Sequence, residues 1–204
     1  MRGAAAEQEM TEQSRLTGLL SDIDGLRSKY EKQAHDVNDL GQLKGLALEV
    51  KPAVYLPRGI DPKEVTAIFG ANGTDVERYG NLVVNRALVE ARVKDQPDIA
   101  ERVGWNQFST FEENVERANP RADSSNLADQ LLMGFILGYP ESALETFTRQ
   151  QQDPAFAKTV ETVHVFAPAS NEEVYTFQVG PGGKDAPDVQ ALQKQVTAAF
   201  EAHS

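Results

Sequence analysis

The first strong pattern in the chain is an apolar stripe near its start. Apolar residues recur there at steps of three, four, three and four, which places them on one side of an α-helix and matches a coiled-coil heptad. The pattern predicts a helix from Thr11 through Tyr30 that continues or restarts through Leu40. The stripe consists of Leu16, Leu19, Ile23, Leu26 and Tyr30, and Val37 and Leu40 extend it beyond Gln33.

A stripe of this kind needs a cover, which comes either from the rest of the chain or from a second copy. With Leu16 at heptad position a, Asp22 and Arg27 would attract each other across a parallel dimer. Leu20, however, falls at position e and widens the stripe, which favours packing into a globular body. The sequence therefore favours an internal cover over a homodimer seam. The helix expected at the C-terminus offers a matching apolar side, made of Val189, Leu192, Val196 and Ala199.

Two capping patterns predict helix starts in the first half of the chain. Asp61 precedes a proline, which fits the first position of a helix, and Glu64 lies where it can reach back to the cap. Thr74 and Glu77 have the spacing of a capping box, and the segment that follows has apolar residues on one side. We therefore expect one short helix after Asp61 and a longer helix over residues 75–93.

Shorter elements are expected around these two helices. Residues 53–56 lie between two prolines and predict an edge strand, a position that tolerates the missing backbone donor of proline. A brief helix is expected over residues 97–104. The next helix starts with a capping box, and two pairs have the required spacing: Ser109 with Glu112, and Thr110 with Glu113.

The most apolar segment predicts the centre of the core. Residues 127–137 are apolar on nearly all sides, as expected for a helix surrounded by other elements. Gly138 is placed to end this helix in a left-handed conformation, and Pro140 can open the next one. The next helix has its apolar side at Ala143, Leu144 and Phe147.

Toward the C-terminus, β-branched and aromatic residues gather in two short runs. The runs, residues 162–166 and 174–179, are joined by a polar link, which predicts an antiparallel hairpin. Glycines from Gly180 onward end the second run, and Pro187 opens a final helix. The predicted fold class is therefore α+β and mainly α-helical, with a helical core around Leu127–Leu137 and a small antiparallel β-hairpin near the C-terminus.

The length of 204 residues fits a single domain. We assign residues 11–204 to one helical α+β domain and residues 1–10 to a flexible leader. These first residues carry one positive charge and lack the apolar stretch of a signal peptide. The longest apolar run, Leu131 to Leu137, is too short to cross a bilayer, so no membrane association is expected.

The chain is acidic, with a net charge of −11 and a pI near 4.8. Such a surface repels phosphate groups, so nucleic acid and anionic membranes are disfavoured as partners. The clearest basic cluster is Arg86, Arg92 and Lys94, and Glu90 and Asp95 interrupt it. The absence of cysteine excludes disulfides, thiolate metal sites and cysteine nucleophiles, and it fits a cytoplasmic protein.

One loop has some features of an anion site. Gly180-Pro181-Gly182-Gly183-Lys184 follows a predicted strand and precedes a predicted helix, where backbone amides can hold a phosphate or a carboxylate. The full spacing of a phosphate-binding loop is missing, and Pro181 removes one amide donor. The candidate ligand-binding residues are Gly180, Gly182, Gly183 and Lys184, although a plain strand-to-helix connector is the simpler interpretation.

The histidines do not assemble a recognisable site in the sequence. They are His35, His164 and His203, and no nucleophile-elbow motif accompanies them. His164 lies in a predicted strand, where the neighbouring Glu161 points to the opposite face. We therefore expect a half-exposed sheet residue rather than a metal ligand or a catalytic base, and we expect no cofactor.

Two further clusters have both a structural and a functional interpretation. Glu112, Glu113 and Glu116 could share a helix side and bind a cation, but a solvated helix face is the simpler interpretation. Trp105 and Phe108 flank a helix junction. Such a pair is more often a plug in the core, although a partly exposed Trp105 would be a good anchor for a protein partner.

These observations leave three hypotheses for function. The one we favour is a non-enzymatic cytoplasmic protein-interaction module that acts through a helical surface, alone or as a homodimer. The second is an enzyme or small-ligand protein that binds a phosphate or carboxylate at the Gly180–Lys184 loop. The third is an acidic decoy for a nucleic-acid-binding protein, which rests on net charge alone. The candidate interaction surface consists of Leu16, Leu19, Ile23, Leu26, Tyr30 and Trp105.

Overall fold

The computed structural model describes residues 2–32, 41–118, 126–168 and 172–203, with only the backbone described for residues 2–10. The helices are α1 (Arg2–Lys32), α2 (Gly41–Ala47), α3 (Pro62–Ala71), α4 (Arg86–Asp95), α5 (Pro97–Arg102), α6 (Phe111–Ala118), α7 (Leu127–Ile136), α8 (Glu141–Gln152) and α9 (Pro187–Glu201). The strands are β1 (Ala53–Tyr55), β2 (Glu77–Tyr79), β3 (Leu82–Val84), β4 (Glu161–Phe166) and β5 (Glu173–Val179). Two short 3-10 turns are η2 (Phe156–Lys158) and η3 (Gly183–Asp185).

The fold is α+β and mainly helical, as the sequence predicts. The C-terminal hairpin is confirmed, because β4 and β5 pair antiparallel with Val163 opposite Phe177. A second, three-stranded antiparallel sheet has the order β1-β3-β2. The predicted edge strand is β1, which lies at the border of this sheet and pairs with β3.

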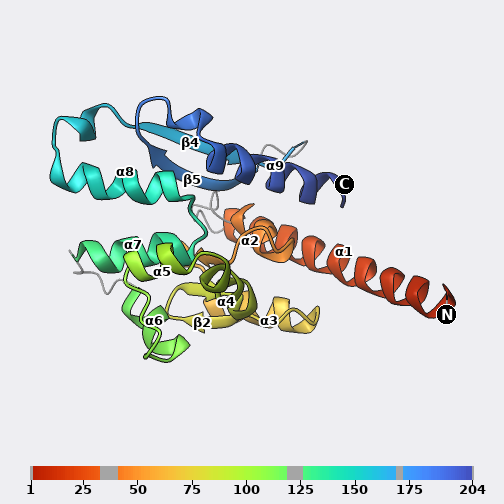
Figure 1. Ribbon diagram of the computed structural model, residues 1–204. Helices are drawn as coiled ribbons and strands as arrows, with labels where there is room; N and C mark the ends of the chain where they lie inside the picture. Colours follow the sequence, from red (N-terminus) through yellow and green to blue (C-terminus); the bar gives the residue numbers. More distant parts are fainter. Residues whose placement is uncertain (1, 33–40, 119–125, 169–171, 204) are drawn as a thin grey trace.

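Figure 1 shows these elements in two layers. The β4–β5 hairpin, α8 and α9 form one layer, and the three-stranded sheet with α3 to α7 forms the other. The first half of α1 projects beyond both layers, with the N-terminus at its far end. Among the residues that the structure describes, every helix is too short or too polar to cross a lipid bilayer.

The prediction of a helix over residues 75–93 is wrong, because the β2–β3 hairpin occupies the first half of this range. Thr74 and Glu77 do not form a capping box, since Glu77 lies within β2. The hairpin turns at Gly80-Asn81, where Gly80 has a φ of 60°, a left-handed conformation that glycine adopts without strain. This Gly-Asn pair, followed by a β-branched run, is the sequence signal of the hairpin.

The apolar stripe of α1 is covered by the chain itself. Its cover includes Leu46 of α2, Phe69 of α3 and Val83 of β3, which share one cluster with it. The stripe is therefore packed inside the molecule rather than against a second copy. The C-terminal helix α9, which the sequence offers as a matching partner, packs on the β4–β5 hairpin instead. The buried members of the stripe are Leu19, Ile23, Leu26 and Tyr30, while Leu16 is half-buried.

The start of α1 differs from the sequence expectation. The helix begins at Arg2, earlier than the expected start near Thr11, and it is described as far as Lys32. The expected extension through Val37 and Leu40, together with His35, lies outside the described residues.

Helix α7 lies at the centre of a second cluster, as the sequence predicts, and residues 132–136 are all buried. Gly138 follows it with a φ of 86°, which confirms the left-handed end. A Cβ atom at this position would lie 2.7 Å from Cδ of Pro52 and 2.8 Å from Oη of Tyr175. The close approach and the positive φ both require glycine here, and α8 opens after Pro140, as expected.

Two cations hold the connection between α7 and α8. Nζ of the buried Lys51 lies 3.4 Å from the carbonyl oxygen of Leu137 and 3.7 Å from the ring centre of Tyr175. Nη2 of Arg92 donates to the carbonyl oxygen of Tyr139 at 2.5 Å, and burial lowers the pKa of Arg92. Positive charge stabilises the carbonyl groups that a helix end leaves unpaired. These contacts fix α7 and α8 to the rest of the molecule.

Candidate interaction groove

An open groove of about 760 Å³ lies beside the first half of α1. Its walls come from α1, the end of α2, the turn between α3 and β2, the start of α4 and the end of α9. Acidic side chains outnumber basic ones in these walls. The acids are Glu12, Glu49, Asp75, Glu77 and Glu90, and the arginines are Arg15 and Arg86.

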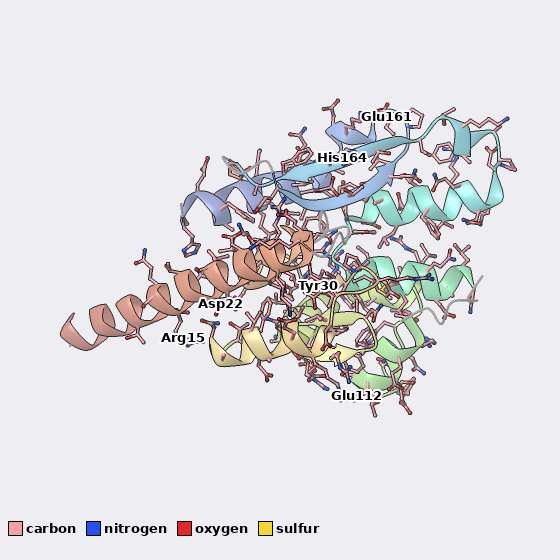
Figure 2. The ribbon with its side chains drawn as sticks, turned by 180° about the vertical axis from the view of Figure 1, so that it is seen from behind. Arg15, Asp22, Tyr30, Glu112, Glu161 and His164 are labelled. Carbon is pink, nitrogen blue, oxygen red and sulfur yellow. The ribbon has the colours of Figure 1, made fainter. Side chains whose placement is uncertain are left out.

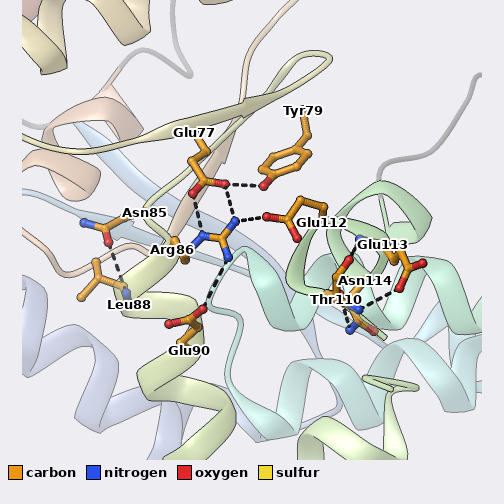
Figure 3. A network of polar contacts seen from close by, with 10 residues as sticks. All are labelled: Glu77, Tyr79, Asn85, Arg86, Leu88, Glu90, Thr110, Glu112, Glu113 and Asn114. Atoms are coloured by element: carbon orange, nitrogen blue, oxygen red, sulfur yellow. Dashed lines mark hydrogen bonds and ion pairs between the residues drawn. The ribbon is translucent and has the colours of Figure 1, made fainter. Parts of the chain in front are cut away.

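The position of Arg86 follows from the cap of α4. Oδ1 of Asn85 accepts a hydrogen bond from the backbone N–H of Leu88 at 3.2 Å, so the helix starts at Arg86. Nε and Nη2 of Arg86 then donate to the two carboxylate oxygens of Glu77 at 2.6 Å and 3.1 Å (Figure 3). This two-point contact fixes the guanidinium against β2.

The same guanidinium is surrounded on its other sides. Nη2 also donates to Glu112 of α6, and Nη1 lies 3.7 Å from Oε1 of Glu90 (Figure 3). Cζ lies 4.2 Å from the ring centre of Phe111. Glu77 in turn accepts a hydrogen bond from the hydroxyl of Tyr79. Carboxylates of the chain itself therefore neutralise this arginine, which leaves it unsuited to an external anion.

The pKa shifts in this network do not favour proton transfer. Hydrogen bonds from Arg86 hold the pKa of Glu77 below its ordinary value. The pKa of Glu112 is lowered by a hydrogen bond from its own backbone amide and then by Arg86. Burial, followed by the hydrogen bond to Glu77, raises the pKa of Tyr79. The carboxylates are thus weak bases and the phenol keeps its proton, whereas catalysis needs groups with a pKa near the working pH.

The other arginine of the groove is also occupied. Nε of Arg15 donates to the carbonyl oxygen of Asn72 at 2.9 Å, and Nη2 donates to that of Gly73 at 2.6 Å. The side chain of Asn72 donates to Oδ2 of Asp22 at 2.9 Å. Figure 2 shows Arg15 and Asp22 on α1, near the end of α3. These bonds tie the projecting helix to the end of α3.

Three carboxylates of the groove stay open. Within the described residues, the side chains of Glu12, Glu49 and Asp75 form no hydrogen bond or ion pair. Because both arginines are taken up, the groove keeps an excess of negative charge. Sequence reasoning missed these three residues, because they come from distant segments that only the fold brings together.

The backbone at Glu49 is unusual. It has a φ of 58°, and no other non-glycine residue in the described part of the chain has a positive φ. The residue follows the end of α2, where the backbone N–H groups of Val50 and Lys51 both donate to the carbonyl oxygen of Gly45 at 3.0 Å. Glycine is usual at such a helix end, and any other L-residue costs about 1 kcal/mol. The chain therefore keeps an exposed carboxylate at the groove despite local strain.

The candidate anion loop holds an anion that belongs to the chain. Nζ of Lys184 lies 3.1 Å from Oε2 of Glu161, and the backbone N–H of Gly182 binds the same carboxylate. These contacts, the Lys184 hydrogen bond first, lower the pKa of Glu161. The N–H of Gly180 donates to a threonine hydroxyl of α8 at 2.9 Å, and the N–H of Gly183 donates to a carbonyl within the loop at 2.8 Å. Of the four candidate residues, Gly182 and Lys184 therefore bind the carboxylate of Glu161, and the N–H groups of Gly180 and Gly183 have other partners within the chain.

The two histidines that the structure describes, His164 and His203, belong to different parts of the molecule. His164 is exposed on β4, as expected (Figure 2), and its Nδ1 lies 2.6 Å from Oε2 of Glu173 on β5. Its ring stacks on Phe166 with 5.9 Å between ring centres. His203, after α9, lines the groove. His164 is therefore one member of a surface pair on the hairpin.

The two candidate aromatic residues behave differently. Trp105 is half-buried and meets Phe111 edge-on, with 5.8 Å between ring centres, so it plugs the core. Phe108 is 90% exposed, and its backbone N–H donates to Oδ1 of Asn106 at 2.9 Å. Of this pair, Phe108 is therefore the side chain that protrudes.

The acidic cluster on α6 separates into different roles. Thr110 and Glu113 form the predicted capping box, with reciprocal bonds of 2.7 Å and 3.1 Å. Glu112 turns instead to Arg86, and Glu116 is exposed. Across the parts of the chain that the structure describes, no group of three or more histidines and acids could hold a metal ion.

Comparisons of the chain with family models, with curated proteins and with solved structures found no match. The interpretation of the groove therefore depends on its geometry. Its arginines are taken up by the chain, and its open charges are carboxylates.

Proposed function

We propose that the protein is a non-enzymatic cytoplasmic interaction module that binds a basic segment of a partner protein in the groove beside α1. One observation carries the proposal: the groove has three open carboxylates and no open arginine within the described residues. A lysine- or arginine-rich segment would supply the missing positive charge. The absence of cysteine supports a reducing, cytoplasmic setting.

The charge of the whole chain supports the same partner. A net charge of −11 attracts a basic protein from a distance and raises its association rate. The same charge opposes a second copy of this chain in the groove. Self-association through the α1 stripe also loses support, because Leu19, Ile23 and Leu26 are buried within the molecule.

The two other hypotheses for function receive different support. A phosphate or carboxylate ligand at the Gly180–Lys184 loop would have to displace Glu161 from Lys184, which disfavours that function. An acidic decoy for a nucleic-acid-binding protein is a special case of the proposed function, since such a partner is basic. Nucleic acid would then compete with the protein for the partner, whereas an ordinary basic partner would show no such competition.

A charge-removal series tests the groove. A lysine-rich peptide with a fluorescent label is titrated with the protein, and binding is followed by fluorescence anisotropy at low and moderate salt. The groove variant combines Glu12→Gln, Glu49→Gln and Asp75→Asn. The control variant removes the same charge from exposed positions outside the groove and combines Asp95→Asn, Glu101→Gln and Glu116→Gln.

The two variants separate a local site from a general charge effect. Each screened ion pair contributes about 0.5 kcal/mol, so the groove variant should bind the peptide about tenfold more weakly. The control should bind almost as well as the unaltered protein. Equal weakening in both variants, or none in the groove variant, would contradict the proposal.

A further inference from the structure

A second hollow, of about 350 Å³, lies between α7, α8 and β5 and shares no residue with the acidic groove. We propose that this hollow binds a neutral, largely apolar small molecule that carries a hydrogen-bonding group. The inference goes beyond the proposed function, because it concerns a different site and a different ligand. The side chains that carry the argument are Leu131, Leu137, Tyr139, Phe147 and Phe177, together with the glutamine pair Gln150 and Gln178.

The walls of the hollow are held in place by close packing. At Gly134, an added Cβ atom would lie 2.9 Å from Cδ2 of Leu144 and 3.3 Å from Cδ2 of Tyr139. Glycine therefore lets α7 approach α8 at this point. The rings of Tyr139 and Phe177 are 5.8 Å apart and tilted against each other, which joins the connection between α7 and α8 to β5. The hollow is thus formed before any ligand arrives.

The chemistry of the lining selects a neutral ligand. Among the residues that the structure describes, no charged side chain lines the hollow, although one quarter of the residues in this chain are charged. A charged ligand would lose its hydration there without gaining a counter-ion, which is unfavourable. A neutral ligand with aromatic or aliphatic groups would instead bury apolar surface against Leu131 and Phe147.

The rim supplies the polar contact. Nε2 of Gln150 donates to Oε1 of Gln178 at 2.8 Å. This bond orients both amides and leaves Oε1 of Gln150 and Nε2 of Gln178 without a partner within the described residues. One acceptor and one donor are thus available to a ligand hydroxyl, amide or carbonyl group. The volume lies in the range of small-molecule pockets.

A neutral fluorescent probe tests the hollow. Phenylnaphthylamine has two apolar aromatic groups and one N–H donor, and its fluorescence rises in apolar surroundings. Leu131→Glu places a charge in the hollow, and Leu131→Trp fills it. Ala128→Glu is the control, because it places the same charge on an exposed position of the same helix, outside the lining. Thermal melting shows whether each variant is folded.

The expected result is saturable binding of one probe per chain. Both substitutions at Leu131 should weaken binding by about tenfold or more in folded protein, while Ala128→Glu should leave it unchanged. Unsaturable binding, or equal binding to all four proteins, would overturn the proposal. The proposal would also be overturned if the probe does not bind and if Leu131→Glu releases a protein partner. The hollow would then bind a side chain of that partner.

Discussion

The groove beside α1 and the hollow between α7 and α8 differ in how the chain treats charge. In the groove, Arg15 and Arg86 are bound by carbonyl groups and carboxylates of the chain, and three acids remain open. In the described part of the chain, no charged side chain lines the hollow. One molecule thus offers two surfaces that suit opposite ligands. The difference teaches that a candidate ligand is indicated by the groups that the fold leaves unsatisfied.

The Gly180–Lys184 loop is an example of the opposite case, in which the fold itself satisfies the groups that could bind a ligand. Its residue types suggest an anion site, and its geometry does hold a carboxylate. That carboxylate belongs to Glu161 of the adjacent strand. A motif that the fold has already satisfied therefore says little about an external ligand.

The largest expected effect comes from the junction that borders the hollow. Gly138→Ala would place a methyl group against Pro52 and Tyr175 on a backbone with a φ of 86°. Left-handed strain and overpacking together should lower the free energy of unfolding by about 4 kcal/mol. Gly70→Ala is the control, because an added Cβ there meets nothing within 4 Å in α3. Denaturant titration that shows similar stability for both variants would contradict this account of the junction.

A somewhat smaller effect is expected at Ile23 of α1, one helical turn from Leu19 in the wall of the groove. Ile23→Ala removes a buried side chain of α1 and should lower the free energy of unfolding by about 3 kcal/mol. Ser14→Ala, on the exposed side of the same helix, should change it by less than about 0.5 kcal/mol. Light scattering at micromolar concentration should give the same mass for both variants and the unaltered chain. If the unaltered chain is a dimer and Ile23→Ala dissociates it, the result would support a coiled-coil interface between two copies of α1.

Local patterns explain why some elements could be predicted from the sequence. The three-four spacing of the α1 stripe, the left-handed Gly138 and the Thr110–Glu113 box each depend on neighbouring residues alone. The Thr74–Glu77 spacing led to the wrong prediction of a helix, because a capping box and the start of a strand can contain the same residue types. Residues 77–79 pair instead with the buried strand β3, and this tertiary pairing outweighs the local preference.

The groove and the hollow could not be predicted in the same way. Glu12 and Asp75 reach one groove from α1 and from the turn before β2. Leu131 and Phe177 likewise meet at the hollow only after α7 and β5 have packed. Such sites depend on long-range packing, whereas hydrophobic periodicity reports local structure.

The next effect sharpens the role of Arg86 in the groove. Arg86→Gln removes the cation that pairs with Glu77, and a partly exposed ion pair of this kind contributes up to about 1 kcal/mol at neutral pH. Because the pKa of Glu77 is lowered from 4.5 on folding, this stabilisation is complete above pH 4.5 and is lost as the pH falls through the folded-state value. The variant and the unaltered protein should therefore converge in stability on acidification. Arg78→Gln, on the same hairpin, should show no such convergence.

The smallest expected effect is at Glu49, where two substitutions distinguish the cost of backbone strain from the contribution of the carboxylate to binding. Glu49→Gly relieves a φ of 58° but adds freedom to the unfolded chain, so the net gain in the free energy of unfolding should be about 0.5 kcal/mol. Glu49→Gln keeps the strain and should not share this gain. Both variants remove one groove carboxylate, so both should bind the lysine-rich peptide about twofold more weakly. If Glu49→Gly gains stability and binds the peptide as before, the carboxylate at this strained position contributes nothing to the groove.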